Sequence, residues 1–446
     1  MIGAPAQMQS QSPVETIGTM NQNVFVLGLD EANAEVLRSL DGADSLAFHQ
    51  LLTRDELQQG EVNVPDLLDR AEVQLTAFDG TVDAIVNFWD FPATMMAPIL
   101  CARRGLPSAD LGAVVRCEHK YWSRLVQSRV TNSLPAFGLL DLDADEPHLP
   151  DGVSYPAWIK PVESASSEGA YRVADQPQLA DVLPRAREDV TRMGRPFEDV
   201  LAMLHLPPEI EQVGGTAYMA EEVADGHQMT LEGFVADGTV TAYGLVASIN
   251  YPDSSSFLRY QYPAPVPLAV RDRIVEISTQ VIAATGLDTS TFNIEYFWDP
   301  ETGRIRLLEI NARHSQEHAR LFEMVDGVPN HAAMVRLGLG QVPDPPRGER
   351  RRYPMAAKWF LRHFSDGIVR RVPDESTLAR LEERLDGSVH VRATEGTRLS
   401  AGYGEDSYSY VLAEVFVGGE DEEELRRKYD EFRDGVEFEI DDVEEA

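Results

Sequence analysis

Residues 292–318 read FNIEYFWDPETGRIRLLEINARHSQEH, and this stretch decides the fold of the central part of the chain. Two apolar-rich runs, 291–298 and 304–310, flank residues 299–303, whose Asp, Pro, Thr and Gly are typical of a turn. Two short apolar runs on either side of a turn predict a β-hairpin.

Polar side chains interrupt both predicted strands. Glu295 lies on the first strand, Glu309 and Asn311 lie on the second, and Arg313 follows. Because strand side chains alternate between faces, Glu309, Asn311 and Arg313 share a face if the extended geometry continues. If the hairpin register also brings Glu295 alongside, two carboxylates, an amide oxygen and a guanidinium converge. Such oxygen ligands suit Mg²⁺ held together with phosphate oxygens, so we predict a magnesium–nucleotide site.

A solvated strand face is the commoner explanation for such a polar pattern. Here the neighbours Leu307, Leu308 and Ile310 make the second strand strongly apolar. A strand buried on both faces does not normally carry carboxylates without compensating cations. The apolar context therefore favours a functional cluster.

The composition of the 446-residue chain predicts a globular protein of two to four domains. No apolar run approaches the roughly 18–20 residues of a membrane span. Residues 1–22 lack the basic and apolar regions of a secretory signal, so we expect a disordered leader and a cytoplasmic protein. Cys101 and Cys117 then indicate buried or free thiols, with a disulfide as the minor alternative. The net charge of −35 argues against nucleic acid and anionic membranes as partners.

Lysine is rare in this chain. The 39 basic residues include only four lysines, which are Lys120, Lys160, Lys358 and Lys428. Lysine binds phosphate as a compact point charge, whereas arginine is bulky, planar and forked. Each lysine is therefore a candidate for chemistry.

Lys160 lies near the end of a predicted strand and precedes a loop of small residues, 163–169 (ESASSEG). Such a loop can wrap backbone N–H groups around phosphate oxygens while the lysine neutralises charge. A plain serine-rich turn is the alternative. Farther along, residues 218–223 (YMAEEV) offer strand backbone and carboxylates for an adenine and a ribose, or form an ordinary acidic strand end.

In order and spacing, these motifs resemble the ATP-grasp superfamily. The motifs are Lys120, Lys160 with its loop, Glu221–Glu222–Val223, Glu295 and the Glu309-x-Asn311-x-Arg313 strand. The resemblance implies an α/β and α+β fold class, with a Rossmann-like pre-ATP-grasp domain, a two-lobed ATP-grasp domain and a small C-terminal α+β domain with an acidic tail. The expected bounds are 1–22 for the leader, 23–115, 116–345 (mobile lobe about 155–225) and 346–446.

The resemblance also implies a role for each motif residue. The residues implied to bind ATP are Lys120, Lys160, Ser164, Ser166, Ser167, Gly169, Glu221, Glu222, Val223 and Gln228. Glu221 and Val223 would meet the adenine edge, by side chain or backbone. Gln228 lies near the position where a ribose-binding carboxylate is often found. Glu295, Glu309 and Asn311 would hold two Mg²⁺ ions, for which Mn²⁺ can substitute.

The chemistry implied is ATP-driven activation of a carboxylate through an acyl phosphate, which Arg313 would hold. An amine would then displace phosphate to give an amide, with release of ADP and phosphate. Residues 248–267 resemble the substrate segment of amino-acid ligases, which makes Arg259 a candidate for binding a substrate carboxylate. Glu317 is a candidate for orienting or deprotonating the amine, with a helix-start carboxylate as the alternative.

The expected partners are a small carboxylic acid and an amine, with amino acids as the expected class and a homodimer as the default assembly. Two other functions stay open. The biotin-carboxylase branch shares the LEINAR-like strand and the Glu317–His318 pair, so a bicarbonate-using carboxylase is one alternative. A non-catalytic ATP-binding protein that keeps the fold is the other.

Overall fold

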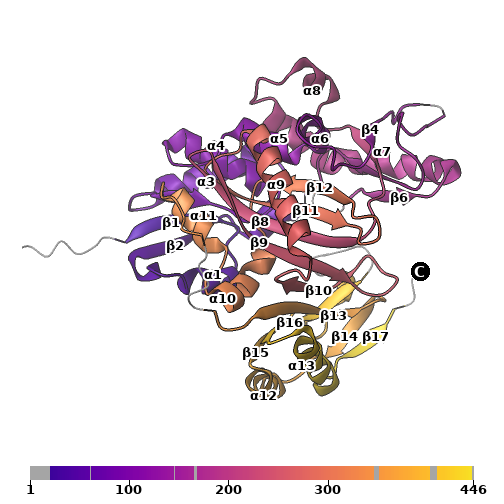
Figure 1. Ribbon diagram of the computed structural model, residues 1–446. Coiled ribbons are helices and arrows are strands. Elements are labelled where there is room, and N and C mark those ends of the chain that lie inside the picture. The colour runs from indigo at the N-terminus through magenta and orange to yellow at the C-terminus, as the bar shows by residue number, and fades with distance from the viewer. Residues whose placement is uncertain are drawn as a thin grey trace, which may run out of the picture.

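The structure is a computed structural model that describes residues 21–60, 62–144, 146–164, 168–345, 351–401 and 409–443, without the side chains of 191–193. It contains an N-terminal α/β unit, a lobe with a four-stranded sheet and a long central sheet (Figure 1). The predicted mixture of α/β and α+β architecture is confirmed.

The N-terminal unit is a three-stranded parallel sheet in the order β2-β1-β3, as its strand–helix alternation predicts. Its strands are β1 (Gln22–Leu27), β2 (Leu46–Leu51) and β3 (Ala84–Val86). Its helices are α1 (Glu31–Arg38), α2 (Arg54–Gln58), α3 (Val64–Ala77) and α4 (Ala93–Arg104), with the 3-10 turn η1 (Ala43–Ser45). Parallel strands end at a common edge, and the loop after β3 leaves that edge toward the rest of the molecule.

Two helices, α5 (Leu111–Glu118) and α6 (Lys120–Gln127), follow this unit. They meet at His119, whose extended backbone (φ −66°, ψ 95°) ends one helix and caps the next. The His119 ring accepts a hydrogen bond from the backbone N–H of Trp122 at 3.3 Å. This cap sets Lys120 at the first turn of α6.

The four-stranded sheet has the order β4-β7-β5-β6. Its strands are β4 (Phe137–Leu140), β5 (Ala157–Pro161), β6 (Tyr171–Val173) and β7 (Tyr218–Glu222), and the lobe also carries α7 (Gln176–Leu201) and α8 (Pro208–Val213). The sequence predicts helices over 176–190 and 197–204, but α7 is one helix that continues through Pro184 and Pro196. The break expected over 207–215 contains the short helix α8.

The central sheet has eight strands in the order β12-β11-β8-β9-β10-β13-β16-β15, and its ladders are all antiparallel. The strands are β8 (His227–Ala236), β9 (Thr239–Asn250), β10 (Phe257–Tyr262), β11 (Ser290–Trp298), β12 (Ile305–Asn311), β13 (Met355–His363), β15 (Gly387–Val391) and β16 (Tyr410–Gly419). The C-terminal strands β13, β15 and β16 are thus part of the same sheet, which they join through β10, a strand within the predicted substrate segment 248–267.

Helices and short elements complete the fold. They are α9 (Leu268–Thr285), η2 (Gln316–His318), α10 (Ala319–Asp326), α11 (His331–Gly338), α12 (Glu375–Leu385), η3 (Leu399–Ala401) and α13 (Glu422–Gly435), with the β14 (Gly367–Arg371) and β17 (Glu439–Asp442) pair. Among the helices in the described part of the chain, not one combines the length and apolar character needed to span a bilayer.

The hairpin of β11 and β12 has the predicted form, with Glu295 directly opposite Glu309 and Asn293 opposite Asn311. The register shifts by one residue, so that Leu308 has no partner on β11. This β-bulge explains how Leu307 and Ile310, three positions apart, both reach the core.

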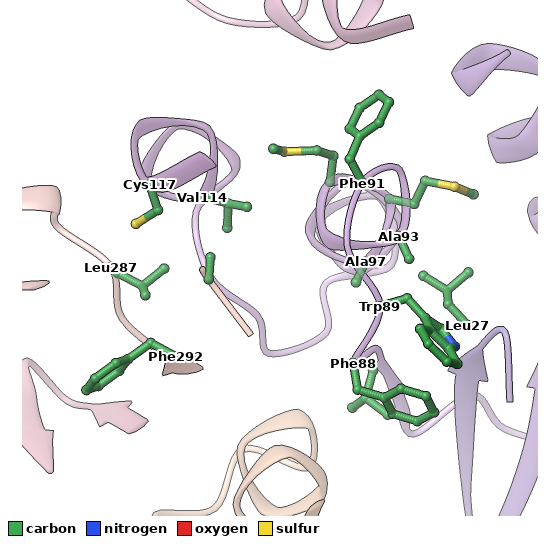
Figure 2. Close-up of a cluster of buried hydrophobic side chains, with 14 of the residues drawn as sticks. Leu27, Phe88, Trp89, Phe91, Ala93, Ala97, Val114, Cys117, Leu287 and Phe292 are labelled. Carbon is green, nitrogen blue, oxygen red and sulfur yellow. The ribbon is translucent and has the colours of Figure 1, made fainter. Parts of the chain in front are cut away.

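One hydrophobic core joins the N-terminal unit to the back of this hairpin. Figure 2 shows Phe88, Trp89 and Phe91 from the N-terminal unit in the same cluster as Phe292 of β11. Cys117 of α5 also lies there, and both cysteines are buried and free. Because this core fixes one face of the hairpin, the polar face is fixed as well.

Candidate active site

Glu295, Glu309 and Asn311 share the face of the hairpin that points away from the core. The amide nitrogen of Asn311 donates to Asn293 Oδ1 at 2.9 Å, so the amide oxygen of Asn311 is the atom left to act as a ligand. Gln228 donates to Glu295 Oε2 at 2.9 Å. Gln228 therefore lies at the carboxylate pair instead of at a separate ribose contact.

Lys120 interacts electrostatically with four surrounding carboxylates. Its ammonium donates to the backbone oxygen of Ser164 at 2.8 Å, at the start of the small-residue loop. Although burial opposes it, the surrounding carboxylates raise the pKa of Lys120. The carboxylates that act on it are, from the strongest, Glu309, Glu163, Glu118 and Asp90.

Carboxylates outnumber cations at this place. Burial and then Glu309 raise the pKa of Glu295 to about 7, and burial and then Asp90 raise the pKa of Glu118 to about 7. Burial raises the pKa of Glu163 well above its usual range, and Glu163 Oε2 is a buried oxygen without a hydrogen-bond partner among the described residues.

This excess of buried carboxylates fits divalent cations, because a buried charge needs a compensating partner. Within the described ranges, no three His, Cys, Asp or Glu side chains are grouped so as to hold a metal by themselves. The residues present suit Mg²⁺, which one or two carboxylates hold together with phosphate oxygens.

Arg313 receives a partner from the N-terminal unit. Its Nε donates to Asp90 Oδ1 at 2.6 Å, and Asp90 lies in the loop between β3 and α4. One residue earlier, the backbone N–H of Ala312 donates to Glu118 Oε1 at 2.8 Å. The strand that carries the candidate metal ligands is thus held by α5 and by the edge of the parallel sheet.

Lys160 and Glu221 lie on adjacent strands of the four-stranded sheet and form an ion pair of 2.7 Å. Arg124 of α6 binds the same carboxylate at 2.6 Å. Although burial raises it, these two cations lower the pKa of Glu221 to about 2. Lys160 and Arg124 therefore hold the Glu221 side chain. The groups of this segment that can bind an adenine edge are the backbone atoms of Glu222 and Val223.

The small-residue loop is described only at its ends. Ser166 and Ser167, both predicted to contact phosphate, lie outside the described residues, whereas Ser164 and Gly169 lie within them. Gly169 has φ +69°, and a Cβ there would lie 2.8 Å from the Tyr218 hydroxyl. The backbone conformation and the close approach both require glycine at this position.

Glu317 lies in η2, four residues after Arg313, and forms an ion pair with Lys358 of β13. Lys358 also pairs with Glu414 of β16 at 2.9 Å. Although burial raises it, Lys358 lowers the pKa of Glu317 to about 2. An ionised carboxylate of such low pKa is better suited to orient an amine than to deprotonate it.

Arg259 is not brought to this cluster. Its guanidinium binds Glu422 of α13 at 2.6 Å and lies 4.6 Å above the Trp359 ring. Arg259 pairs with Trp359 in the ladder, so both side chains lie on the face of the sheet covered by α13. Glu317 contacts Lys358, the neighbour of Trp359, on the opposite face. The predicted substrate contact of Arg259 is thus not supported by its position.

The structure adds residues that the motifs did not include. They are Asp90, Glu118, Arg124 and Glu414; Glu163 begins the predicted small-residue loop but had no predicted role, and Lys358 was noted only through the rarity of lysine. Glu118 and Glu163 lie two or three positions from the motif lysines, which is a usable signal. Asp90 and Arg124 follow no recognisable pattern, because their roles depend on contacts across about 100 residues or more.

The chain is similar to known proteins at the level of family and fold. The family described as "ATP-grasp domain" matches residues 153–319. The uncharacterized protein y4rH of Sinorhizobium fredii is 25% identical over 246 residues. That match covers 54% of this chain and 46% of the relative, so the chain spans about half the length of the curated relative it matches.

Two solved structures show the extent of the fold similarity. The L-amino acid ligase from Bacillus licheniformis is 17% identical, with a TM-score of 0.70 over 95% of this chain and 100% of that chain. The biotin carboxylase domain of the Hydrogenobacter thermophilus 2-oxoglutarate carboxylase, in complex with MgADP and bicarbonate, is 15% identical. Its TM-score is 0.60 over 94% of this chain and 91% of that chain. Both similarities cover almost the whole chain.

Proposed function

Residues 153–319 form an ATP-grasp domain, and from that premise we propose that the protein is an ATP-dependent carboxylate–amine ligase. ATP-grasp enzymes are ATP-dependent ligases that bind ATP with Mg²⁺. The observation that carries the proposal is the opposed pair Glu295 and Glu309, which lies with Asn311 beside Lys120 and Arg313. This is a buried site in which metal ligands, a phosphate-binding ammonium and an anion-binding guanidinium face one another.

In this proposal the nucleotide lies between the four-stranded sheet and the hairpin. Lys120 and Lys160 bind phosphate oxygens, and the backbone of Glu222 and Val223 binds the adenine edge. Glu295, Glu309 and Asn311 would be the protein ligands of Mg²⁺, which would offset the negative charge of the phosphate groups.

The reaction begins when an oxygen of the substrate carboxylate attacks the γ-phosphorus and the bond to the β-phosphate oxygen breaks. ADP leaves, and Arg313 and the lysines offset the negative charge on the transferred phosphoryl group. A neutral amine then attacks the acyl carbon, phosphate leaves, and the amine nitrogen loses a proton as the amide forms. The proposed substrates are two small molecules, with amino acids as the expected class.

Glu317 has a positioning role in this scheme. Lys358 keeps its carboxylate ionised, so Glu317 can accept a hydrogen bond from an amine N–H without taking the proton. A bicarbonate-using carboxylase stays the second candidate, because the same Glu317–His318 pair follows Arg313 and the fold is similar to a biotin carboxylase domain.

The test is a screen for ADP release with pairs of carboxylic acids and amines, followed by mass spectrometry of the product. The proposal predicts ADP and phosphate release that requires both substrates, and an amide product. Glu309→Gln should remove turnover, whereas Glu301→Gln, in the exposed turn of the same hairpin, should not. Formation of AMP and pyrophosphate would overturn the mechanism. Turnover with bicarbonate and biotin but not with amines would favour the carboxylase.

A further inference from the structure

Arg124 is one of the most deeply buried large side chains of the molecule, with 2% of its surface exposed. It extends from α6 into the junction between the four-stranded sheet and the hairpin, and its nitrogens donate to three different elements. Its acceptors are Glu221 of β7, Gln127 of α6 and the backbone oxygen of Leu308 in β12. Because the planar guanidinium of this buried arginine donates hydrogen bonds to three acceptors, its position is fixed.

The Glu221 carboxylate is shared between two cations. Its Oε1 accepts from Arg124 Nε at 2.6 Å. Its Oε2 is bound by Lys160 Nζ at 2.7 Å, with Arg124 Nη2 at 3.3 Å. The three groups together carry one net positive charge. Without Arg124, both carboxylate oxygens would be left to Lys160, and the remaining pair would carry no net charge.

The other end of Arg124 reaches the bulge in β12. Leu308 has no partner on β11, so its carbonyl oxygen lies outside the regular ladder, and Arg124 Nη2 donates to it. Glu309, a candidate metal ligand, is the next residue. Arg124 thus connects a candidate phosphate-binding lysine with the strand that carries the candidate metal ligands.

We propose that Arg124 is a positioning residue: by binding one oxygen of the Glu221 carboxylate, it leaves the charge of Lys160 available to a nucleotide phosphate. This inference rests on the proposed function, since it assumes that Lys160 binds phosphate. A lysine at position 124 should not replace the arginine, because its three N–H donors lie on one nitrogen, whereas Arg124 reaches its acceptors from Nε, Nη1 and Nη2.

The test measures binding of Mg-ADP by isothermal titration calorimetry, with no second substrate. Arg124→Met should weaken binding about tenfold or more, because Lys160 then stays on Glu221. The double variant Arg124→Met/Glu221→Gln should recover binding to within about threefold of the wild type, because Lys160 is released. Arg116→Met is the matched control: Arg116 of α5 donates to the Thr285 carbonyl and lies over the Trp122 ring, away from Glu221.

Thermal melting of each variant accompanies the titrations. The double variant replaces the Arg124–Glu221 pair by uncharged side chains and leaves Lys160 as the one charge of the three groups. If Arg124→Met does not fold, the binding of the double variant decides the case. Unchanged Mg-ADP affinity in Arg124→Met, or a double variant that folds but stays tenfold weak, would overturn the inference. A wild-type protein that does not bind Mg-ADP would instead overturn the proposed function.

Discussion

At the scale of single residues, the opposition of Glu295 and Glu309 carries the most information. Two carboxylates face each other across a ladder whose other face packs in the core, so a bound cation or a proton is needed to offset their repulsion. In the metal-free protein the pair therefore lowers the stability of the fold. Binding of a divalent ion should offset the repulsion between the two carboxylates and so stabilise the fold.

Glu309→Gln should raise the stability of the metal-free protein while removing activity. Relief of like-charge repulsion of about 1 kcal/mol should raise the melting temperature by about 1–3 °C in a chain of this size. ADP release should fall by at least about 100-fold, since a metal ligand is lost. Melting curves with EDTA and the ADP assay measure both effects. A melting temperature that falls by many degrees would identify Glu309 as a structural residue.

The raised pKa of Glu295 predicts a pH dependence. An unfolded Glu titrates near about 4.3, whereas burial and Glu309 hold the pKa of Glu295 at about 7 in the folded protein. Between these values the folded state keeps a proton that the unfolded state has lost, so stability falls as pH rises from about 4.5 to 7. Buried His331, whose pKa is lowered to about 3 by burial, acts in the opposite direction.

The comparison of wild type with Glu295→Gln isolates this group from the histidines. With EDTA present, the variant should be the more stable protein, and its advantage should grow from pH 5 to pH 7 and then level off. Added Mg²⁺ should remove much of the advantage by stabilising the wild type above pH 7. An advantage that is constant with pH would show that Glu295 titrates normally in the folded state.

The motif residues were predictable because strand alternation and chain order are local properties. The pairing of Glu295 with Glu309 followed from the hairpin alone. Asp90 and Arg124 were not predictable, because one lies 223 residues from its partner Arg313 and the other 97 residues from Glu221. Nothing in their local sequence distinguishes them from surface residues.

At the scale of elements, periodicity predicts helices over 93–104 and 268–285, and α4 and α9 have these bounds. It failed at α7, because Pro184 and Pro196 normally end a helix, whereas here packing of the helix on the lobe outweighs the lost hydrogen bonds. It also failed at β10, because the register of this strand shifts between Phe257 and Arg259 and its polar residues Arg259 and Gln261 are buried.

The position of β10 predicts that Arg259 acts in stability and not in catalysis. Arg259→Met should lower the free energy of unfolding by roughly 1–2 kcal/mol, because it breaks the ion pair between the buried guanidinium and the partly exposed Glu422 and also a cation–π contact. The KM values for both substrates should stay within about twofold. Arg426→Met is the matched control, since Arg426 binds the same Glu422 from an exposed position and should change stability by less than about 0.5 kcal/mol. A large rise in the KM for one substrate would instead support a contact between Arg259 and that substrate.

At the scale of the whole molecule, the fold was predictable but the pairing of the C-terminal strands was not. The proline-rich, charged residues 342–352 predict a linker, yet β13, β16 and β15 beyond it continue the sheet that begins at the hairpin with the candidate metal ligands (Figure 1). A sequence shows where a linker lies but not whether strands pair again beyond it. Nothing tests the predicted domain bounds directly, and they stay predictions.

The charge of the molecule predicts a response to salt. With a net charge of −35, the folded chain repels itself, and screening by salt relieves this repulsion. The melting temperature should rise by several degrees between 50 mM and 1 M NaCl, or equally with KCl. Buried pairs such as Arg124–Glu221 are screened little and should not offset the gain. A flat or falling profile would mean that surface ion pairs outweigh the repulsion.

The bulge at Leu308 limits how this strand can change over generations. Because Leu308 is an extra residue on β12, an in-frame loss of its codon would leave Leu307, Glu309 and Ile310 in regular alternation. Each of these side chains would keep its face, and Arg124 would lose its carbonyl acceptor. We therefore expect the extra residue Leu308 and Arg124 to be kept or lost together. Descendants of one ancestral gene that lack one of the two residues should also lack the other.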